Sequence, residues 1–435
     1  MNEIAVVGGG LAGSLLACFL AQRGEKVVLY ERRSDPRAGT PERGRSINLA
    51  LSERGLNALR RVQLDKEVLA DALPMRGRMI HPVAGELDFQ PYSADGERAI
   101  NSISRGALNN VLLDAAESVV DIRFAHRLSE LDPETGTMVF QTPDGEVRTG
   151  AAVIFGADGA GSAVRGQLVR HGVTEETLDF LDYGYKELTI PPRDGEFALD
   201  PGALHIWPRG ASMMIALPNP DRSFTCTLFW PNSGTGAFAS LSSPSAIERF
   251  FAARYPDVPP LVPGLVADYQ QNPVGLLGTV RCAPWRAGRV CLIGDAAHAI
   301  VPFYGQGANC AFEDVVVLDD CFERTDGNWA ETPALFEASR REDTEAIAQM
   351  ALANFTEMRD KVSSPVYRLG KRIEHTLERF FPGRYVSRYE LVSFSNVPYA
   401  QVRRRVRTQH GALVAAGIGL SAAIAGGTAK AWRRS

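Results

Sequence analysis

The chain has 435 residues, a formal net charge of -4 and a pI near 6.1. A single hydrophobic core rarely grows beyond about 250 to 300 residues, so two or three packed units are expected. The small negative charge excludes a broad basic surface, and no nucleic-acid partner is expected.

Cysteine and histidine spacing argues against a metal site. None of the seven histidines has ligand spacing, and the six cysteines form no pair of the metal or redox type. Most cysteines lie within apolar runs, which predicts reduced core residues in a cytoplasmic protein. The opening MNEIAVVGGG enters a predicted strand at once, so no secretion signal is expected.

A nucleotide-binding pattern occupies residues 4–31, IAVVGGGLAGSLLACFLAQRGEKVVLYE. Apolar runs at 4–7 and 27–30 predict two strands, and the stretch between them predicts a helix that ends near residue 22. Gly8 suits the tight turn, Gly10 lets a pyrophosphate approach the backbone, and Gly13 lets the helix pack closely on the strand. The spacing therefore predicts dinucleotide binding at the start of this helix.

Glu31, at the end of the second predicted strand, is placed to accept hydrogen bonds from ribose hydroxyls. Its charge disfavours a 2′-phosphate and so favours FAD or NAD over NADP at this site. The adjacent Arg32 and Arg33 weaken that preference.

Two later strand ends carry acidic and glycine residues of the same kind. AAVIFGADGAGSAVR ends a buried strand at Asp158, and RVCLIGDAAHAIVPFYGQGANCAFED ends one at Asp295, ahead of Gly305, Gly307 and Asn309. Ligands of open α/β sheets bind outside the carboxyl ends of the strands, so Asp295 can meet ribityl hydroxyls and the glycines can meet a flavin ring. Either loop alone is better explained by an aspartate helix cap, but together with the first motif they favour a flavin.

A helical stripe further along holds one amide among apolar residues: Ile347, Met350, Ala351, Asn354 and Met358. A buried asparagine needs a hydrogen-bond partner, which is either a ligand or the neighbouring backbone. His298, in the third loop, is expected to pack or to bond backbone and to take no part in catalysis.

Taken in order, these motifs resemble the FAD-dependent aromatic hydroxylases. Longer strings narrow the resemblance to the kynurenine 3-monooxygenase family: GRSINLALSERG (44–55), PMRGRMIH (74–81), YGYKELTIPP (183–192), LHIWPRG (204–210), MMIALPN (213–219), SFTCTLF (223–229) and GDAAHAIVPFYGQGANCAFED. The resemblance spans about residues 3–400, and such strings in order are more specific than any glycine motif.

The resemblance implies that NADPH reduces bound FAD, that dioxygen adds to give a flavin hydroperoxide, and that one oxygen atom passes to the ring 3-position of L-kynurenine. The product is 3-hydroxykynurenine. The flavin carries this chemistry, so no catalytic side chain is assigned and no metal is needed. The sequence holds no second glycine motif, so NADPH is expected to dock transiently. The pathway served, nicotinamide synthesis or tryptophan breakdown, stays open.

The resemblance also implies the site residues. Arg78 and Tyr92 would bind the carboxylate of the substrate. Other substrate contacts would come from Asn354, Tyr389, Ile215, Phe229, Phe303 and Met358. The positions assigned to FAD, with the motif glycines, are Gly8, Gly10, Ala12, Gly13, Glu31, Arg32, Arg33, Ser34, Ala50, Arg105, Leu128, Asp158, Ala163, Asp295, Gly307, Ala308 and Asn309. Ala163 and Ala308 replace a hydroxyl residue and a methionine that are common there, and the change at Ala163 is expected to loosen the cofactor.

The expected fold class is α/β, with a Rossmann-like FAD-binding domain interleaved with a β-sheet substrate domain. Residues 1–75, 98–178 and 277–325 are assigned to the FAD-binding domain, 76–97 and 179–276 to the substrate domain, and 326–435 to a helical C-terminal region. The tail 412–429 is uncharged but rich in glycine and alanine, which makes a membrane span marginal. A helix packed on the protein is favoured, with weak peripheral membrane association as the alternative.

Three other functions compete with this interpretation. A related flavin hydroxylase would act on another aromatic amine or phenol with the same fold. A flavin-binding carrier or interaction protein would bind FAD without turnover. A tryptophan-directed flavin halogenase is disfavoured because no tryptophan-x-tryptophan-x-isoleucine segment is present. The oligomeric state is left open.

Overall fold

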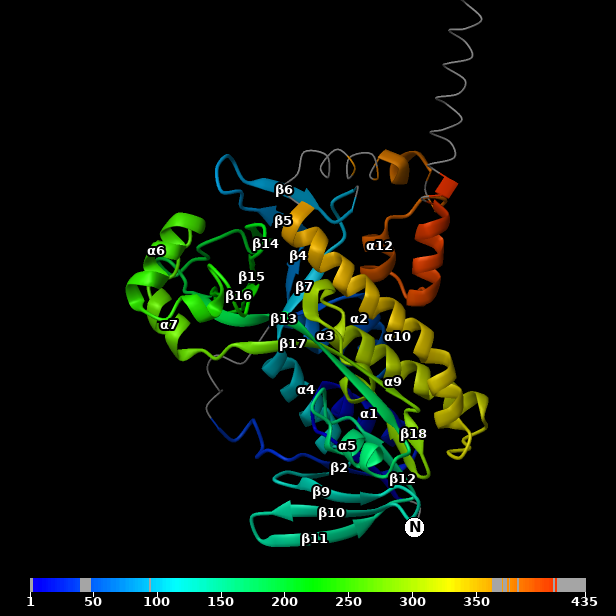
Figure 1. Cartoon of the computed structure of the whole chain (residues 1–435). Helices are drawn as coiled ribbons and strands as arrows, with labels where there is room; N and C mark the ends of the chain where they lie inside the picture. Colours follow the sequence, from blue (N-terminus) through cyan, green and yellow to red (C-terminus); the bar gives the residue numbers. More distant parts are fainter. Residues whose placement is uncertain are drawn as a thin grey trace, which may run out of the picture.

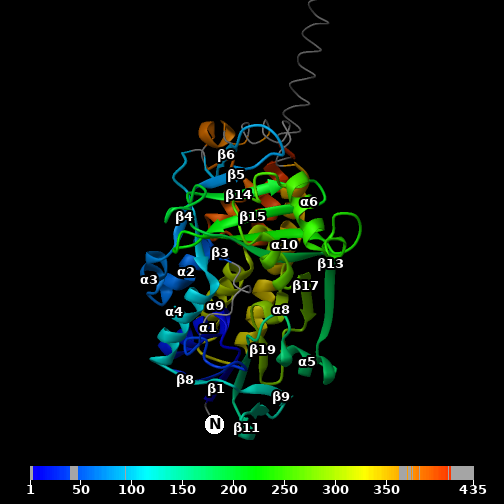
Figure 2. The same ribbon diagram turned by 90° about the vertical axis from the view of Figure 1, so that its left-hand side faces the viewer.

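The computed structural model describes residues 3–39, 48–93, 95–361, 370, 374, 376–381, 383–409 and 411–412. Two large sheets dominate this part of the chain, one above the other in both views (Figures 1 and 2). The predicted tail lies outside the described residues except for residue 412. Among the described residues, no helix is both long and apolar enough to cross a membrane.

The lower sheet has six strands in the order β18-β19-β12-β1-β2-β8. Its central strands pair in parallel, which requires helical crossovers between them. The strands are β1 (Glu3–Val7), β2 (Lys26–Tyr30), β8 (Asp121–Arg123), β12 (Val153–Gly156), β18 (Arg286–Ala287) and β19 (Val290–Leu292). The predicted strands at 4–7 and 27–30 are therefore confirmed.

Helices cover this sheet and bury it in one large apolar core. Near-continuous apolar runs such as residues 4–7 suit strands that are buried on both faces. The covering helices are α1 (Leu11–Gln22), α2 (Glu53–Arg61), α3 (Asp65–Ala70), α4 (Arg105–Glu117), α5 (Ala163–Arg170), α8 (Asp295–His298) and α9 (Gly307–Arg324). The first of these ends at the predicted residue.

The upper sheet has seven strands in the order β17-β13-β16-β15-β14-β5-β6. All neighbours are antiparallel except β14 and β5. The strands are β5 (Gly77–Ile80), β6 (Asp88–Pro91), β13 (Glu175–Ile190), β14 (Ala203–Pro208), β15 (Met213–Pro218), β16 (Phe224–Pro231) and β17 (Gly275–Ala283). One face packs on α6 (Pro244–Arg254) and α7 (Leu265–Gln271). The other face packs on the loop that follows Asp295, around Phe303.

Two small sheets complete the strand content of the described residues. The first is a three-stranded meander that lies at the lower end of Figure 1, and the second joins the two large sheets. The strands are β9 (Arg127–Asp132), β10 (Thr137–Thr142) and β11 (Gly145–Gly150), then β3 (Asn48–Leu51), β4 (Leu73–Met75) and β7 (Ile100–Ser104).

The helical C-terminal part packs along the inner face of the upper sheet and against α9. It contains α10 (Thr332–Thr356), the π-helical turn η3 (Glu357–Lys361), α12 (Arg388–Ser393) and a helix at 399–409. The gold helix α10 runs diagonally across Figure 1 beside α9. The predicted α/β class with C-terminal helices is thus confirmed.

The long strands β13 and β17 link the two halves of the molecule. Both run from the upper sheet down toward α5 and α8 (Figure 2). The strand β13 crosses the predicted domain boundary at 178/179, and β17 crosses that at 276/277. The paired strands β13 and β17 therefore run through both of the expected domains.

Candidate active site

The turn between β1 and α1 leaves open space at the start of the helix. Gly8 has a φ of 115°, and a side chain on Gly13 would place its Cβ 1.9 Å from the Gly8 carbonyl oxygen. Gly10 meets nothing within 4 Å of its Cβ position, and it caps α1 without a side-chain hydrogen bond. The first N–H groups of α1 therefore face a space that an anionic group can enter. These features fit a dinucleotide phosphate.

Glu31 ends β2 and reaches back to the same turn. Its Oε2 accepts a hydrogen bond from the Gly9 N–H at 2.9 Å, and its Oε1 accepts from the Arg33 N–H and Nε at 3.0 Å each. The side chain is buried but still borders the cavity. A carboxylate has about four lone-pair positions, so it can hold the turn and still accept from ribose hydroxyls.

Asp158 follows β12 and hydrogen-bonds the start of α5. Its carboxylate accepts hydrogen bonds from the Ser162 hydroxyl at 2.5 Å and from the Ala163 N–H at 2.6 Å. Burial raises the pKa of Asp158, and these hydrogen bonds oppose that rise. The N-cap of α5 is Ser162, so Asp158 supports the start of the helix without being its cap, and it also borders the cavity.

The loop from Gly294 to Asn309 is held at both ends by side chains. Gly294 and Gly305 have φ values of 62° and 65°, which favour glycine. The Asn309 Nδ2 donates to the carbonyl oxygens of Ala50 and Gly305, at 2.8 Å each, and its Oδ1 accepts from the Ser52 N–H at 2.9 Å. The asparagine thus fixes the start of α9 against β3.

One cavity of about 920 Å³ runs from the β1–α1 turn to the upper sheet. All eight residues predicted to contact substrate line it: Arg78, Tyr92, Ile215, Phe229, Phe303, Asn354, Met358 and Tyr389. Every residue predicted to contact the cofactor lines it as well, except two. Gly13 lies under the turn, where it serves packing, and Ser34 is exposed outside the cavity.

The far end of the cavity combines a buried cation with stacked tyrosines. The Arg78 guanidinium carbon lies 4.7 Å from the Tyr389 ring centroid, and the Tyr92 and Tyr389 rings stack at 4.8 Å. Burial raises the pKa of both tyrosines, so their hydroxyls stay neutral at physiological pH. Arg78 itself is 8% exposed. A neutral hydroxyl beside a guanidinium suits a carboxylate ligand.

One face of the upper sheet forms the cavity wall, and most of it was not predicted. Strand pairing sets Leu204 beside Arg78, and Thr227 beside Ile215. Side chains two apart on a strand share a face, so this wall continues with Met213, Leu217 and Phe229. Of these, only Arg78, Ile215 and Phe229 were predicted. Period-two alternation in MMIALP and TCTLF was the available signal.

Asn354 has a backbone partner. Its Nδ2 donates to the Phe303 carbonyl oxygen at 2.7 Å and lies 3.2 Å from the Met358 sulfur. This is the backbone alternative left open by the sequence, although Asn354 also lines the cavity. Next to Phe303, Tyr304 was missed; its ring stacks on Tyr389 at 5.9 Å, and burial raises its pKa to about 12.

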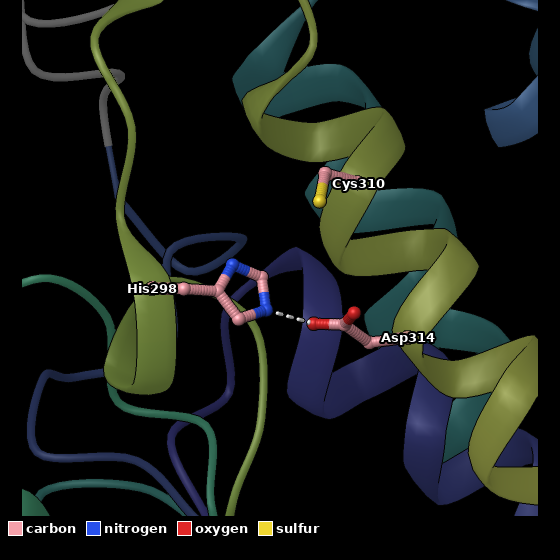
Figure 3. Close-up of side chains that lie close together, drawn as sticks. All are labelled: His298, Cys310 and Asp314. Atoms are coloured by element: carbon pink, nitrogen blue, oxygen red, sulfur yellow. Dashed lines mark hydrogen bonds and ion pairs between the residues drawn. The ribbon is translucent and has the colours of Figure 1, made fainter. Parts of the chain in front are cut away.

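His298 packs beside Trp285 and hydrogen-bonds a carboxylate (Figure 3). Its Nε2 lies 2.5 Å from Asp314 Oδ2, and its ring lies 5.1 Å from that of Trp285. Cys310 brings a third potential metal ligand within 4.8 Å of these two. However, Arg340 Nε donates to Asp314 Oδ1 at 2.7 Å, and burial raises the pKa of the Cys310 thiol well above its ordinary value. The cluster favours a hydrogen-bonded ion network over a cation site.

Comparisons with known proteins agree with this geometry. A family model described as an FAD binding domain matches residues 1–324. The kynurenine 3-monooxygenase of Myxococcus xanthus is 50% identical over 95% of this chain and 89% of its own length. That of Stenotrophomonas maltophilia is 47% identical over 96% and 93%.

Solved structures show the same fold at low identity. The 2-methyl-3-hydroxypyridine-5-carboxylic acid oxygenase has a TM-score of 0.68 at 21% identity, and covers 86% of this chain and 96% of its own. The p-nitrophenol 4-monooxygenase of Pseudomonas putida has a TM-score of 0.66 at 21% identity, with coverage of 87% and 94%.

The family model and the cavity define a flavoprotein with an FAD-binding domain. Identity of 45–50% over about 95% of the chain narrows the class further. The chain belongs to the kynurenine 3-monooxygenase family.

Proposed function

We propose that this protein hydroxylates L-kynurenine at the ring 3-position with FAD, NADPH and dioxygen, and yields 3-hydroxykynurenine, NADP⁺ and water. One feature carries the proposal. A single cavity joins the glycine turn of the lower sheet to a chamber of the upper sheet that ends at the buried Arg78. The dinucleotide and an aromatic amino acid can therefore lie end to end.

Arg78 and Tyr92 would bind the substrate carboxylate at the outer end of the chamber. Neighbouring strands lie about 4.8 Å apart. From β5, the second strand across is β15 with Ile215, and the third is β16 with Phe229. These side chains, with Phe303 and Met358, supply apolar contacts that hold the aniline ring and exclude water.

FAD supplies the redox chemistry when bound, and the chain's own residues orient it. Gly8, Gly10 and the start of α1 would bind the pyrophosphate, and Glu31 the adenosine ribose. Asp295 would meet the ribityl chain, and the N-terminus of α9 at Gly307 would meet the ring system. The other predicted cofactor residues along the cavity stay part of this proposal.

The test is substrate-stimulated turnover of the purified, FAD-loaded protein. We expect NADPH oxidation to rise when kynurenine is added, and chromatography with mass detection to recover 3-hydroxykynurenine in proportion to NADPH. A panel of phenols and aminobenzoates provides the comparison. If a panel member gave more hydroxylated product per NADPH than kynurenine, that compound class would be the substrate. Bound FAD without any stimulated turnover would favour the carrier function.

We also propose that the protein is cytoplasmic. Six buried free cysteines support a reducing compartment. Weak membrane association is the alternative, and exposed apolar side chains between β5 and β6, Val83 and Leu87, favour it. Flotation with anionic vesicles, for the full chain and for a chain ending at Gln409, separates the two. If the full chain floats with the vesicles and the truncated chain does not, the result would support weak membrane association through the tail.

A further inference from the structure

The helix at 399–409 contacts the loop 302–309 through Tyr399. The Tyr399 hydroxyl donates to Gln306 Oε1 at 2.9 Å, and both side chains are at most 1% exposed. Burial raises the pKa of Tyr399 well above its ordinary value, so the hydroxyl keeps its proton. Neither residue lines the cavity, whereas both neighbours of Gln306, Gly305 and Gly307, do.

A buried cation fixes the Tyr399 ring. The Arg54 guanidinium carbon lies 3.8 Å from the ring centroid, and Arg54 Nε donates to the Val392 carbonyl oxygen at 3.2 Å. Arg54 also bonds Glu313 on α9 and the Val397 carbonyl oxygen. Arg54 on α2 is thus held by α9 and by the carbonyl groups of Val392 and Val397, and it fixes the Tyr399 ring in the orientation that lets its hydroxyl reach Gln306.

The loop 302–309 is held from three directions. Asn309 ties its end to β3, Asn354 on α10 ties the Phe303 carbonyl, and Tyr399 ties Gln306. Asn309 and Asn354, which make the first two of these contacts, both line the cavity. The third contact holds Gln306, which lies between Phe303 and Asn309 in sequence, at the left-handed Gly305 turn.

We propose that Tyr399 is a positioning residue, which holds Gln306 and thereby sets the loop 302–309 that borders both halves of the cavity. The C-terminal helix would thus set the geometry between flavin and substrate without touching either. The effect on the loop needs only the contacts above. The effect on hydroxylation rests on the proposed function.

The variant Tyr399→Phe removes one hydroxyl and keeps the ring beside Arg54. The matched control is Tyr255→Phe, because Tyr255 is equally buried and its hydroxyl bonds Ser212 and the Trp230 Nε1, at 3.1 and 3.2 Å, in the distant core beside α6. Both variants lose a buried hydrogen bond, but only the first loses a contact with the loop.

Hydrogen exchange of peptides covering 300–312 is the first measurement, made with and without FAD. The Cys310 N–H, which donates to the Gln306 carbonyl oxygen at 2.7 Å, reports directly on the loop. We expect Tyr399→Phe to speed exchange there about tenfold, and Tyr255→Phe to leave it unchanged. Equal exchange in wild type and Tyr399→Phe, or equal acceleration in both variants, would overturn the proposal.

The second measurement is the yield of 3-hydroxykynurenine per NADPH oxidised. Tyr399→Phe should lower this yield and raise KM, while Tyr255→Phe keeps the wild-type yield. Gln306→Ala should match Tyr399→Phe, and it tests the same contact if Tyr399→Phe does not fold. The double variant should be no worse than either single variant. A wild type without kynurenine turnover refutes the proposed function alone, since the exchange difference still tests the loop.

Discussion

At the scale of single residues, the buried Arg78 is the side chain that we propose for the substrate head group. Its guanidinium lies among the rings of Tyr92 and Tyr389, where water is scarce and a charge-assisted hydrogen bond is strong. A substrate carboxylate that meets Arg78 there would gain a strong charge-assisted hydrogen bond. This is why we propose Arg78 as the contact for an amino-acid carboxylate.

Replacing Arg78 with methionine keeps the volume and removes the charge. We expect kcat/KM for kynurenine to fall about hundredfold, which corresponds to about 3 kcal/mol for a buried charged contact. The ratio of flavin to protein absorbance should not change. The control is Arg76→Met, since Arg76 lies two residues earlier and is exposed. Wild-type kinetics for Arg78→Met would remove Arg78 from the site.

A second residue-scale prediction concerns pH. His205 is 1% exposed, its Nδ1 lies 2.8 Å from His81 Nε2, and its Nε2 donates to the Asp200 carbonyl oxygen. Burial lowers the pKa of His205 to about 4. An unfolded histidine titrates near 6.5, so below that pH the unfolded chain binds more protons than the folded one. The contribution of His205 to the free energy of unfolding is therefore fully present above about pH 6.5 and is lost as the pH falls toward 4.

Denaturant unfolding between pH 7 and pH 4 tests this dependence. His205 should contribute up to about 3 kcal/mol of the decline in unfolding free energy. His205→Gln should flatten the pH profile, whatever its effect at pH 7, while His171→Gln at an exposed position should not. A profile as steep as that of wild type in His205→Gln would contradict the assignment.

At the scale of elements, the packing of α1 on β1 depends on Gly13. An alanine there would place its Cβ 1.9 Å from the Gly8 carbonyl oxygen, so the helix start must shift away from the phosphate position. We expect Gly13→Ala to lose FAD and about 1–3 kcal/mol of stability. Gly166→Ala in α5 meets open space and should keep FAD with a small gain in stability. Flavin content and melting temperature measure both; retained FAD in Gly13→Ala would contradict the packing argument.

The elements of the first unit were predictable because their signals are local. The apolar runs and glycines of residues 4–31 determine β1, α1 and β2 within a few neighbouring residues. Period-two alternation places Thr227 on the same face of β16 as Phe229, but whether this face borders the cavity depends on pairing with β13, which lies far earlier in the sequence. Asn354 was predicted as a buried amide, but its partner at Phe303 required the fold.

At the scale of the whole molecule, ionic contacts join parts that the sequence presents separately. Arg340 on α10 bonds Asp314 and Glu313 on α9, and Asp314 in turn accepts from the Gly294 N–H and meets His298. Burial alone would raise the pKa of Asp314, but His298 and Arg340 lower it below its ordinary value. The C-terminal region thus neutralises a carboxylate that supports the loop after β19.

Arg340 is 1% exposed, and Asp314 has no exposed surface. Arg340→Met would remove the guanidinium that pairs with the buried Asp314 carboxylate, which costs about 3–5 kcal/mol. The neighbouring Arg341→Met removes a largely exposed charge and should cost less than about 1 kcal/mol. Denaturant unfolding of the FAD-loaded protein compares the two. An equal loss in both variants would mean that the C-terminal helices do not depend on this ion network to dock, and that apolar packing along α10 alone holds the two regions together.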